Sequence, residues 1–189
     1  GLVITVDCGI KAFEQVEAIR KKGVGVIVTD HHEPGEKIPN ADAVINPKLC
    51  SNDSKQYLAG AGVSFFLAQK TAKHFGLEPV EDIYCGDMID LAALGTIADS
   101  VPLLGYNRIL VKHGLKRLLH TFNNGLKALL EVEGMLNKDG VSEVEASFKL
   151  IPCLNAAGRI GSAEEALKLL LSESPQEAWE QAVMLHRLN

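Results

Sequence analysis

The sequence predicts an α/β fold in which a parallel, Rossmann-like sheet is followed by a mainly helical portion. Two runs of apolar and β-branched residues, 2–6 and 24–29, flank a segment that carries apolar residues at a spacing of three. A strand, a helix and a strand within about 30 residues form a βαβ unit, whose two strands are parallel. From residue 58 onward the apolar spacing is helical.

Each predicted element follows from its own pattern. The runs LVITV (2–6) and VGVIVT (24–29) are almost continuously apolar, which is typical of parallel strands buried on both faces. Between them a helix is expected over 12–22, and a short strand at 43–45 follows the turn-rich EPGEKIPNAD. Further helices are expected over residues 58–75, 83–98, 107–120, 124–133, 162–171 and 175–188.

Composition narrows the class of protein. The 189 residues include 19 Lys and Arg against 24 Asp and Glu, giving a net charge of −5, and 47% are hydrophobic. That supports a packed core and excludes a disordered chain. No apolar run is long enough to cross a membrane. The acidic balance argues against wholesale electrostatic binding of nucleic acid, unless bound metal ions reverse the local sign.

The four cysteines bear on the cellular location of the protein, and the first residues bear on whether the sequence is a piece of a longer one. The cysteines show no CxxC spacing, so neither a disulfide framework nor a zinc ribbon is predicted, and without an export signal a cytoplasmic location is expected. The chain opens on GLVITV, an apolar strand without an initiator Met. We therefore expect a piece of a longer protein.

Acidic and histidine residues follow the first two strands at the points where they end. Asp7 follows ITV, and Asp30, His31 and His32 follow VIVT. The carboxyl ends of parallel strands form the edge where open α/β sheets bind ligands, and carboxylates with imidazoles suit Mn²⁺ or Mg²⁺. The alternative is that Asp7 caps a helix and the histidines are polar loop residues.

Two further carboxylates come from the apolar segment 90–103. Asp99 ends a predicted buried helix, where it could serve as a ligand or as an ordinary turn residue. Asp90 lies within the apolar part of that helix and needs a partner, so it could accept a hydrogen bond from a ligand histidine.

Seven segments along the chain form an ordered set: VDCGI, VTDHHEP, the Asn46-Pro47 pair, LAGAGVSF, ALGTIADSVPL, NRILVKHGL and PCLNAAGRIGSAEEAL. Together they resemble the DHH phosphoesterase superfamily and, within it, the RecJ family of single-stranded-DNA-specific exonucleases. The resemblance implies a two-metal phosphodiesterase that uses Mn²⁺ or Mg²⁺ to remove nucleotides from the 5′ end of single-stranded DNA in repair and recombination. It makes the predicted sheet a DHH domain core.

The resemblance also assigns roles. Asp7 matches the carboxylate that bridges the two metals, and His31 and Asp99 match metal ligands. Asp30 and His32 match flanking positions that support the ligands and contact the phosphate, which makes all five catalytic candidates.

The resemblance is incomplete at both ends of the chain. The superfamily's first, DxD-type motif would lie upstream of residue 1, and the DHHA1 and OB domains would lie downstream of residue 189. We therefore expect residues 1–189 to form a partial catalytic core, with a sheet part over about 1–104 and a helical part over about 105–189. Alone, it should be weakly active or inactive.

Contacts with DNA are predicted in the second half. Asn155 and Arg159 match residues that face the DNA, and a guanidinium can bind phosphate through two hydrogen bonds. Arg108 begins a weaker candidate, a stripe with Lys112 and Lys116 at spacing four that could equally be a solvated face. The glycines of LAGAG could present N–H groups to a phosphate or allow close packing of a helix on the sheet.

Two other functions stay open. One is a DHH-type oligoribonuclease or cyclic-dinucleotide phosphodiesterase, and the other is a non-catalytic scaffold in replication or repair. A scaffold has no need to keep costly clustered charges together, which favours an enzyme. The expected partners are single-stranded DNA and repair proteins, with no membrane, and the expected oligomeric state is a monomer.

Overall fold

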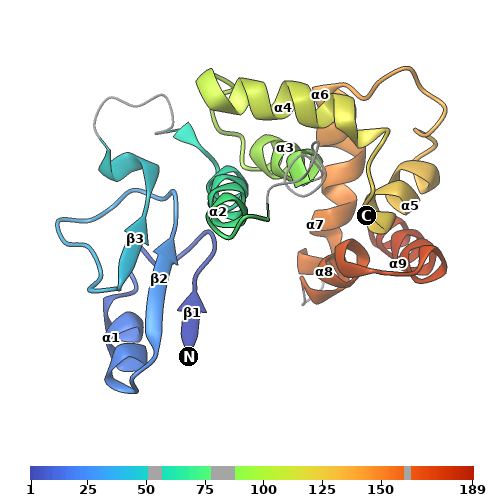
Figure 1. Ribbon diagram of the computed structural model, residues 1–189. Helices are drawn as coiled ribbons and strands as arrows, with labels where there is room; N and C mark the ends of the chain where they lie inside the picture. The colour runs from blue at the N-terminus through green and yellow to red at the C-terminus, as the bar shows by residue number, and fades with distance from the viewer. Residues whose placement is uncertain (51–56, 78–87, 160–162) are drawn as a thin grey trace. The chain divides into compact units, whose positions relative to one another are not determined.

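The computed structural model describes residues 1–50, 57–77, 88–159 and 163–189 (Figure 1). Internal contacts divide the chain into two compact units, Gly1–Val111 and Lys112–Asn189. The boundary falls inside helix α4 (Gly105–Leu118), a little beyond the division expected near residue 104. That both parts belong to one catalytic core stays a prediction.

The first unit contains the predicted parallel sheet. Strands β1 (Leu2–Ile4), β2 (Gly25–Thr29) and β3 (Ala43–Ile45) lie in the order β1-β2-β3, and both pairs are parallel. The α/β class is confirmed. Burial differs from the expectation at β1, whose residues are all exposed, because β1 is an edge strand in the described part of the sheet.

Helix α1 (Phe13–Lys21) completes the βαβ unit and packs on the sheet (Figure 1). Val16 of this helix meets Val26 and Val28 of β2, and all three side chains are almost fully buried. The predicted spacing of apolar residues therefore reflects a real buried face.

Helices α2 (Gly60–His74) and α3 (Ile89–Ala98) pack against each other in the same unit. Helix α3 is apolar on every side, and Ala92, Ala93 and Leu94 are buried. Residues 83–87, the start of the helix expected over 83–98, lie outside the described residues.

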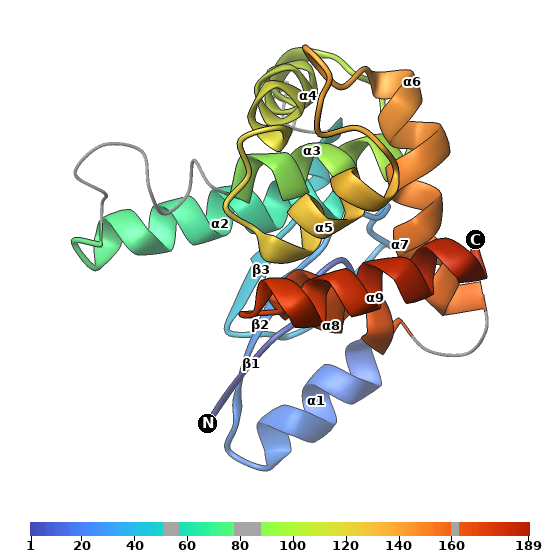
Figure 2. The same cartoon turned by 90° about the vertical axis from the view of Figure 1, so that its right-hand side faces the viewer.

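The second unit is helical, as predicted. Helices α5 and α9 lie side by side, and α7 and α8 also pack on α9 (Figure 2). Leu169 and Leu185 are fully buried in the core they share. The elements are α5 (Asn124–Val132), α6 (Glu143–Glu145), a π-helical segment (Ala146–Leu150), α7 (Ile151–Arg159), α8 (Glu164–Leu171) and α9 (Pro175–Leu188).

The continuous helical run from Glu143 to Arg159 was not predicted. Its start carries a capping box, in which the Ser142 side chain accepts from the backbone N–H of Glu145 and the Glu145 side chain accepts from the backbone N–H of Ser142. The signal Ser-x-x-Glu was present in the sequence, but no helix was predicted between residues 133 and 162.

None of the helices in the described ranges is both long and apolar enough to span a membrane.

Gly125 lies in close contact with the backbone of α8 and gives a stability prediction. A Cβ at this position would lie 2.2 Å from the Leu169 carbonyl oxygen, which is backbone and cannot swing away. We expect Gly125→Ala to lower the free energy of unfolding by about 1–3 kcal/mol, measured by urea denaturation.

Gly158→Ala is the matched control. Gly158 is also helical, but a Cβ there meets nothing within 4 Å. The better helix propensity of alanine should raise the stability of this variant by about 0.5–1 kcal/mol. Equal effects of the two substitutions would contradict the packing argument.

Candidate metal centre

Asp7 is presented by a tight turn after β1. Its backbone has a φ of 61°, in the left-handed region that side-chain-bearing residues rarely adopt. The turn is closed by the Thr5 hydroxyl, which donates to the Cys8 carbonyl oxygen over 2.7 Å, and Gly9 follows with a φ of 111°. The Asp7 carboxylate is thereby held at the sheet edge with 57% of its side chain exposed.

Two threonines tie the ends of β1 and β2 together. The Thr29 hydroxyl donates to the Thr5 carbonyl oxygen over 2.6 Å, and the Thr29 backbone N–H donates to the Thr5 hydroxyl over 3.1 Å. Because Asp7 and Asp30 follow these threonines, the paired bonds fix the separation of the two acidic loops. The sequence reasoning missed this role of Thr5.

The buried carboxylate of Asp30 organises the loop that contains both histidines. It accepts backbone N–H bonds from Ile10 (2.9 Å), His31 (2.7 Å) and His32 (3.1 Å), and it bonds the His32 ring nitrogen Nδ1 (2.7 Å). Burial raises the pKa of Asp30, but the hydrogen bonds from Ile10, His32 and His31 outweigh it, so this pKa lies below its ordinary value. Asp30 is thus an ionised anchor.

His31 brings two carboxylates together. Its Nε2 atom lies 3.0 Å from Asp7 Oδ1 and 3.5 Å from Asp99 Oδ2. The atom is buried, yet it makes no hydrogen bond of acceptable geometry within the described part of the chain. A buried nitrogen that faces two carboxylates without a proper hydrogen bond is the arrangement expected of a metal ligand.

His32 is oriented from both sides. Its Nδ1 bonds Asp30, so a neutral ring presents the lone pair of Nε2. Its carbonyl oxygen accepts from the side chain of Asn46, a buried residue that follows β3, over 2.9 Å. Ligand atoms of Asp7, His31 and His32 all lie within 4.8 Å of one another.

Asp99 approaches the same group from the end of α3. It is the C-cap of that helix, and Ser100 next to it has a φ of 56°. The buried Asn107 side chain donates to the Pro102 carbonyl oxygen (2.9 Å) and the Tyr57 carbonyl oxygen (2.8 Å), which fixes the loop beyond Asp99. The three predicted ligands therefore meet in one place.

Gly60 gives Asp7 the space it occupies. A Cβ on Gly60 would lie 2.1 Å from Asp7 Oδ1, far inside contact distance. Gly60 is the first residue of α2, so the carboxylate also lies at the positive end of that helix. This contact differs from both roles considered for LAGAG, because the close neighbour of Gly60 is a carboxylate. Both of those roles stay predictions.

Asp90 is fully buried in the first turn of α3, where its Oδ1 accepts from the Leu91 backbone N–H over 2.7 Å. Its predicted support of a ligand histidine stays a prediction.

The donor set fits a hard divalent cation. Asp7 and Asp99 offer carboxylate oxygens and His31 offers an imidazole nitrogen, and none of these three is a thiolate. Such ligands suit Mn²⁺ or Mg²⁺, and the partial exposure of both carboxylates leaves positions open for water or substrate.

The predicted DNA contacts lie elsewhere in the chain. Asn155 is exposed on α7, and Arg159 is the last residue of that helix, one turn further on. Ile160 and Gly161 of the same motif are outside the described residues.

The basic stripe lies along α4, where Arg108, Lys112 and Lys116 are all exposed. The hollow that Lys112 and Lys116 line also contains Asp139 and Glu143, so its charge is mixed. The stripe is therefore a weaker candidate for binding phosphate than a purely basic surface.

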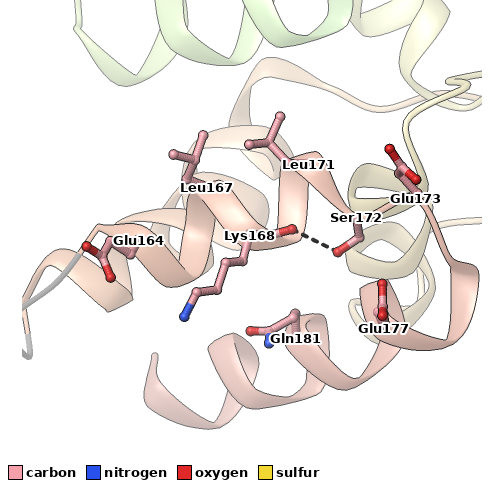
Figure 3. Close-up of a pocket in the computed structure, with 8 residues that line it drawn as sticks. All are labelled: Glu164, Leu167, Lys168, Leu171, Ser172, Glu173, Glu177 and Gln181. Carbon is pink, nitrogen blue, oxygen red and sulfur yellow. Dashed lines mark hydrogen bonds between the residues drawn. The ribbon is translucent and has the colours of Figure 1, made fainter.

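A pocket of about 630 Å³ between α8 and α9 was not predicted (Figure 3). Glu164, Glu173 and Glu177 line it, and Lys168 is the one cation among the described residues of its wall. Three carboxylates would repel a phosphate backbone, so this pocket does not add to the predicted DNA contacts.

Residues 1–96 match the family described as "DHH family, N-terminal domain", and this match decides the family of the chain. The chain belongs to the DHH family. The match includes Asp7 and the Asp30-His31-His32 triplet, and the resemblance seen in the sequence is confirmed.

Within this family, the chain is similar to curated relatives and to a solved structure. Over the whole length of this chain, 44% of its residues are identical to those of the single-stranded-DNA-specific exonuclease RecJ of Thermus thermophilus, and 43% are identical to those of the same exonuclease from Bacillus subtilis. The chain spans only about a quarter of these relatives, 27% and 23%. The crystal structure of Thermus thermophilus RecJ with Mn²⁺ matches 99% of the chain and 27% of that protein, with a TM-score of 0.87 and 42% identity.

Gly60 gives the first test of the centre. We expect Gly60→Ala to displace the Asp7 carboxylate and to weaken Mn²⁺ binding about tenfold or more, measured from the free Mn²⁺ signal in electron paramagnetic resonance. Gly62→Ala is the matched control, because its Cβ would meet only side-chain atoms, of which the nearest are Leu58 Cδ2 at 3.1 Å and Leu110 Cδ1 at 3.4 Å. Unchanged Mn²⁺ affinity in a folded Gly60→Ala variant would contradict the role assigned to this glycine.

Asp30 gives the second test. Asp30→Ala removes the acceptor of four hydrogen bonds, so the free energy of unfolding should fall by about 3 kcal/mol or more in urea denaturation. His32→Ala removes only one of these bonds and should cost about 1 kcal/mol. A smaller loss for Asp30→Ala than for His32→Ala would show that Asp30 is not the anchor.

Proposed function

We propose that this chain provides the metal-binding core of an exonuclease that hydrolyses single-stranded DNA from the 5′ end, in DNA repair and recombination. The observation that carries the proposal is the buried His31 Nε2, which faces the carboxylates of Asp7 and Asp99 without a hydrogen bond of its own in the described part of the chain. The similarity to RecJ exonucleases over the whole chain adds the substrate and the cation, Mn²⁺ or Mg²⁺.

Each residue of the centre would have its own task. Asp7, His31 and Asp99 would hold the cation, and by the family resemblance Asp7 would also bind a second one. A bound pair of divalent ions supplies a nucleophilic hydroxide from water and neutralises charge on the phosphate oxygens. Asp30 keeps His31 and His32 in position, and the Nε2 atom of His32 is available to contact the scissile phosphate.

The DNA strand would be held by the second unit. Asn155 and Arg159 are four residues apart on α7, so they lie on the same face of the helix. A guanidinium can grip a phosphate through two parallel hydrogen bonds, and an amide can bond a base or a sugar. Arg108 is a weaker third contact.

The alternatives have less support. The relatives from Thermus thermophilus and Bacillus subtilis are both named as single-stranded-DNA-specific exonucleases, and neither is named for oligoribonucleotides or cyclic dinucleotides. A scaffold would not need the arrangement around His31. We further propose that the protein works as a monomer in the cytoplasm, where its DNA substrate and its repair partners are found.

The ligand roles are tested by substitution in the complete protein. His31→Ala and Asp99→Ala should each lower Mn²⁺-dependent release of nucleotides from a 5′-labelled single strand by about 10³-fold, because the cation loses a direct ligand. Asp139→Asn is the control, since this carboxylate is exposed and far along the chain from the ligands. Turnover that survives either ligand substitution would refute the assigned roles. Residues 1–189 alone should show little turnover.

The DNA contact is tested by the salt dependence of binding. Arg159→Ala should weaken binding of all sequences alike and should reduce the slope of log affinity against log salt by about 1. Arg187, an exposed arginine of α9, provides the control in Arg187→Ala. If the salt slope is the same in wild type and Arg159→Ala, this arginine does not bind a phosphate.

A further inference from the structure

The second unit contains a cluster of potential metal ligands that the proposed nuclease activity does not use. Glu133 is the C-cap of α5, Cys153 lies on α7, and His186 lies in the last turn of α9. The Cys153 thiol donates to Glu133 Oε1 over 3.2 Å, and His186 Nδ1 lies 2.6 Å from the same oxygen. One sulfur, one oxygen and one nitrogen from three helices therefore converge, all within 4.8 Å of one another.

Cys153 does not have the surroundings of a reactive cysteine. Cys153 is completely buried, and burial followed by the Glu133 carboxylate raises the pKa of the thiol to about 12. A nucleophilic or redox-active cysteine needs a lowered pKa and access to solvent. Cys153 has neither property.

The geometry allows one cation at the centre of the cluster. In a tetrahedral zinc site with ligand distances of about 2.0–2.3 Å, neighbouring ligand atoms are about 3.3–3.7 Å apart. The separation of Cys153 and Glu133 is already close to this, and that of His186 and Glu133 would have to widen by less than about 1 Å. The His186 side chain is half exposed, so it can make this shift and it leaves a route for the ion.

The ligand types select a different cation from that of the first unit. The first cluster offers only carboxylates and imidazoles, which suit Mn²⁺ or Mg²⁺. A thiolate together with an imidazole and a carboxylate favours Zn²⁺, with water as the fourth ligand. The two clusters also lie in separate units of the chain.

We propose that Glu133, Cys153 and His186 form a binding site for a thiophilic divalent cation of the Zn²⁺ class. Binding replaces the thiol proton, which leaves to solvent, so one proton is released for each ion bound. The ion would cross-link α5, α7 and α9 and stabilise the helical unit. This inference does not depend on the proposed nuclease activity.

The test is a Co²⁺ titration of residues 1–189 followed by absorption, since Co²⁺ takes the place of Zn²⁺ and reports its ligands. We expect a near-ultraviolet band from thiolate-to-cobalt charge transfer, together with visible bands of tetrahedral cobalt, at one equivalent. Zn²⁺ should remove these bands. The first cluster has no thiolate among its ligand atoms, so Co²⁺ bound there gives no thiolate charge-transfer band.

Three variants decide whether the cluster is the source. Cys153→Ser should abolish the charge-transfer band, and His186→Ala, at a half-exposed position, should weaken Co²⁺ binding at least tenfold. Cys8→Ser is the matched control, because Cys8 is an exposed thiol next to Asp7, and it should keep the band. No band in the wild type, or a band that survives both Cys153→Ser and His186→Ala, would overturn the proposal.

Discussion

The candidate metal centre depends on one buried carboxylate. Asp30 accepts hydrogen bonds from the turn after β1 through Ile10 and from its own loop through His31 and His32. With only 1% of its surface exposed, it would be unfavourable to bury without these partners. These bonds join the turn after β1 to the loop after β2 and orient the His32 ring. The candidate ligands are thus supported by a residue that lies behind them.

The sequence predicted the elements that have regular patterns. The strands, α1 and the apolar α3 were predicted from apolar spacing because burial itself produces that spacing. The convergence of Asp7, His31 and Asp99 was predicted from strand ends and from the family resemblance. The helical run through α7 was missed, because Asn155 and Gly158 have low helix propensity and packing in the second unit overrides it.

Other features of the centre could not be predicted from a single sequence. The contact of Gly60 with Asp7 joins residues more than fifty positions apart, and the pairing of Thr5 with Thr29 depends on the strand register. The exposure of β1 also follows from its place at the edge of the sheet and not from its own residues. Such facts belong to tertiary structure, which local patterns do not contain.

The left-handed backbone of Asp7 and Ser100 has a consequence for the thermostability of this fold. Each of these residues costs on the order of 1 kcal/mol that a glycine would not, and each lies at the carboxylates around His31. A selection for thermal resistance alone should therefore favour glycine at both positions, and at Asp7 it would delete a candidate ligand. Stability and the proposed metal binding would compete at this corner of the sheet, and the sequence would represent a compromise between them.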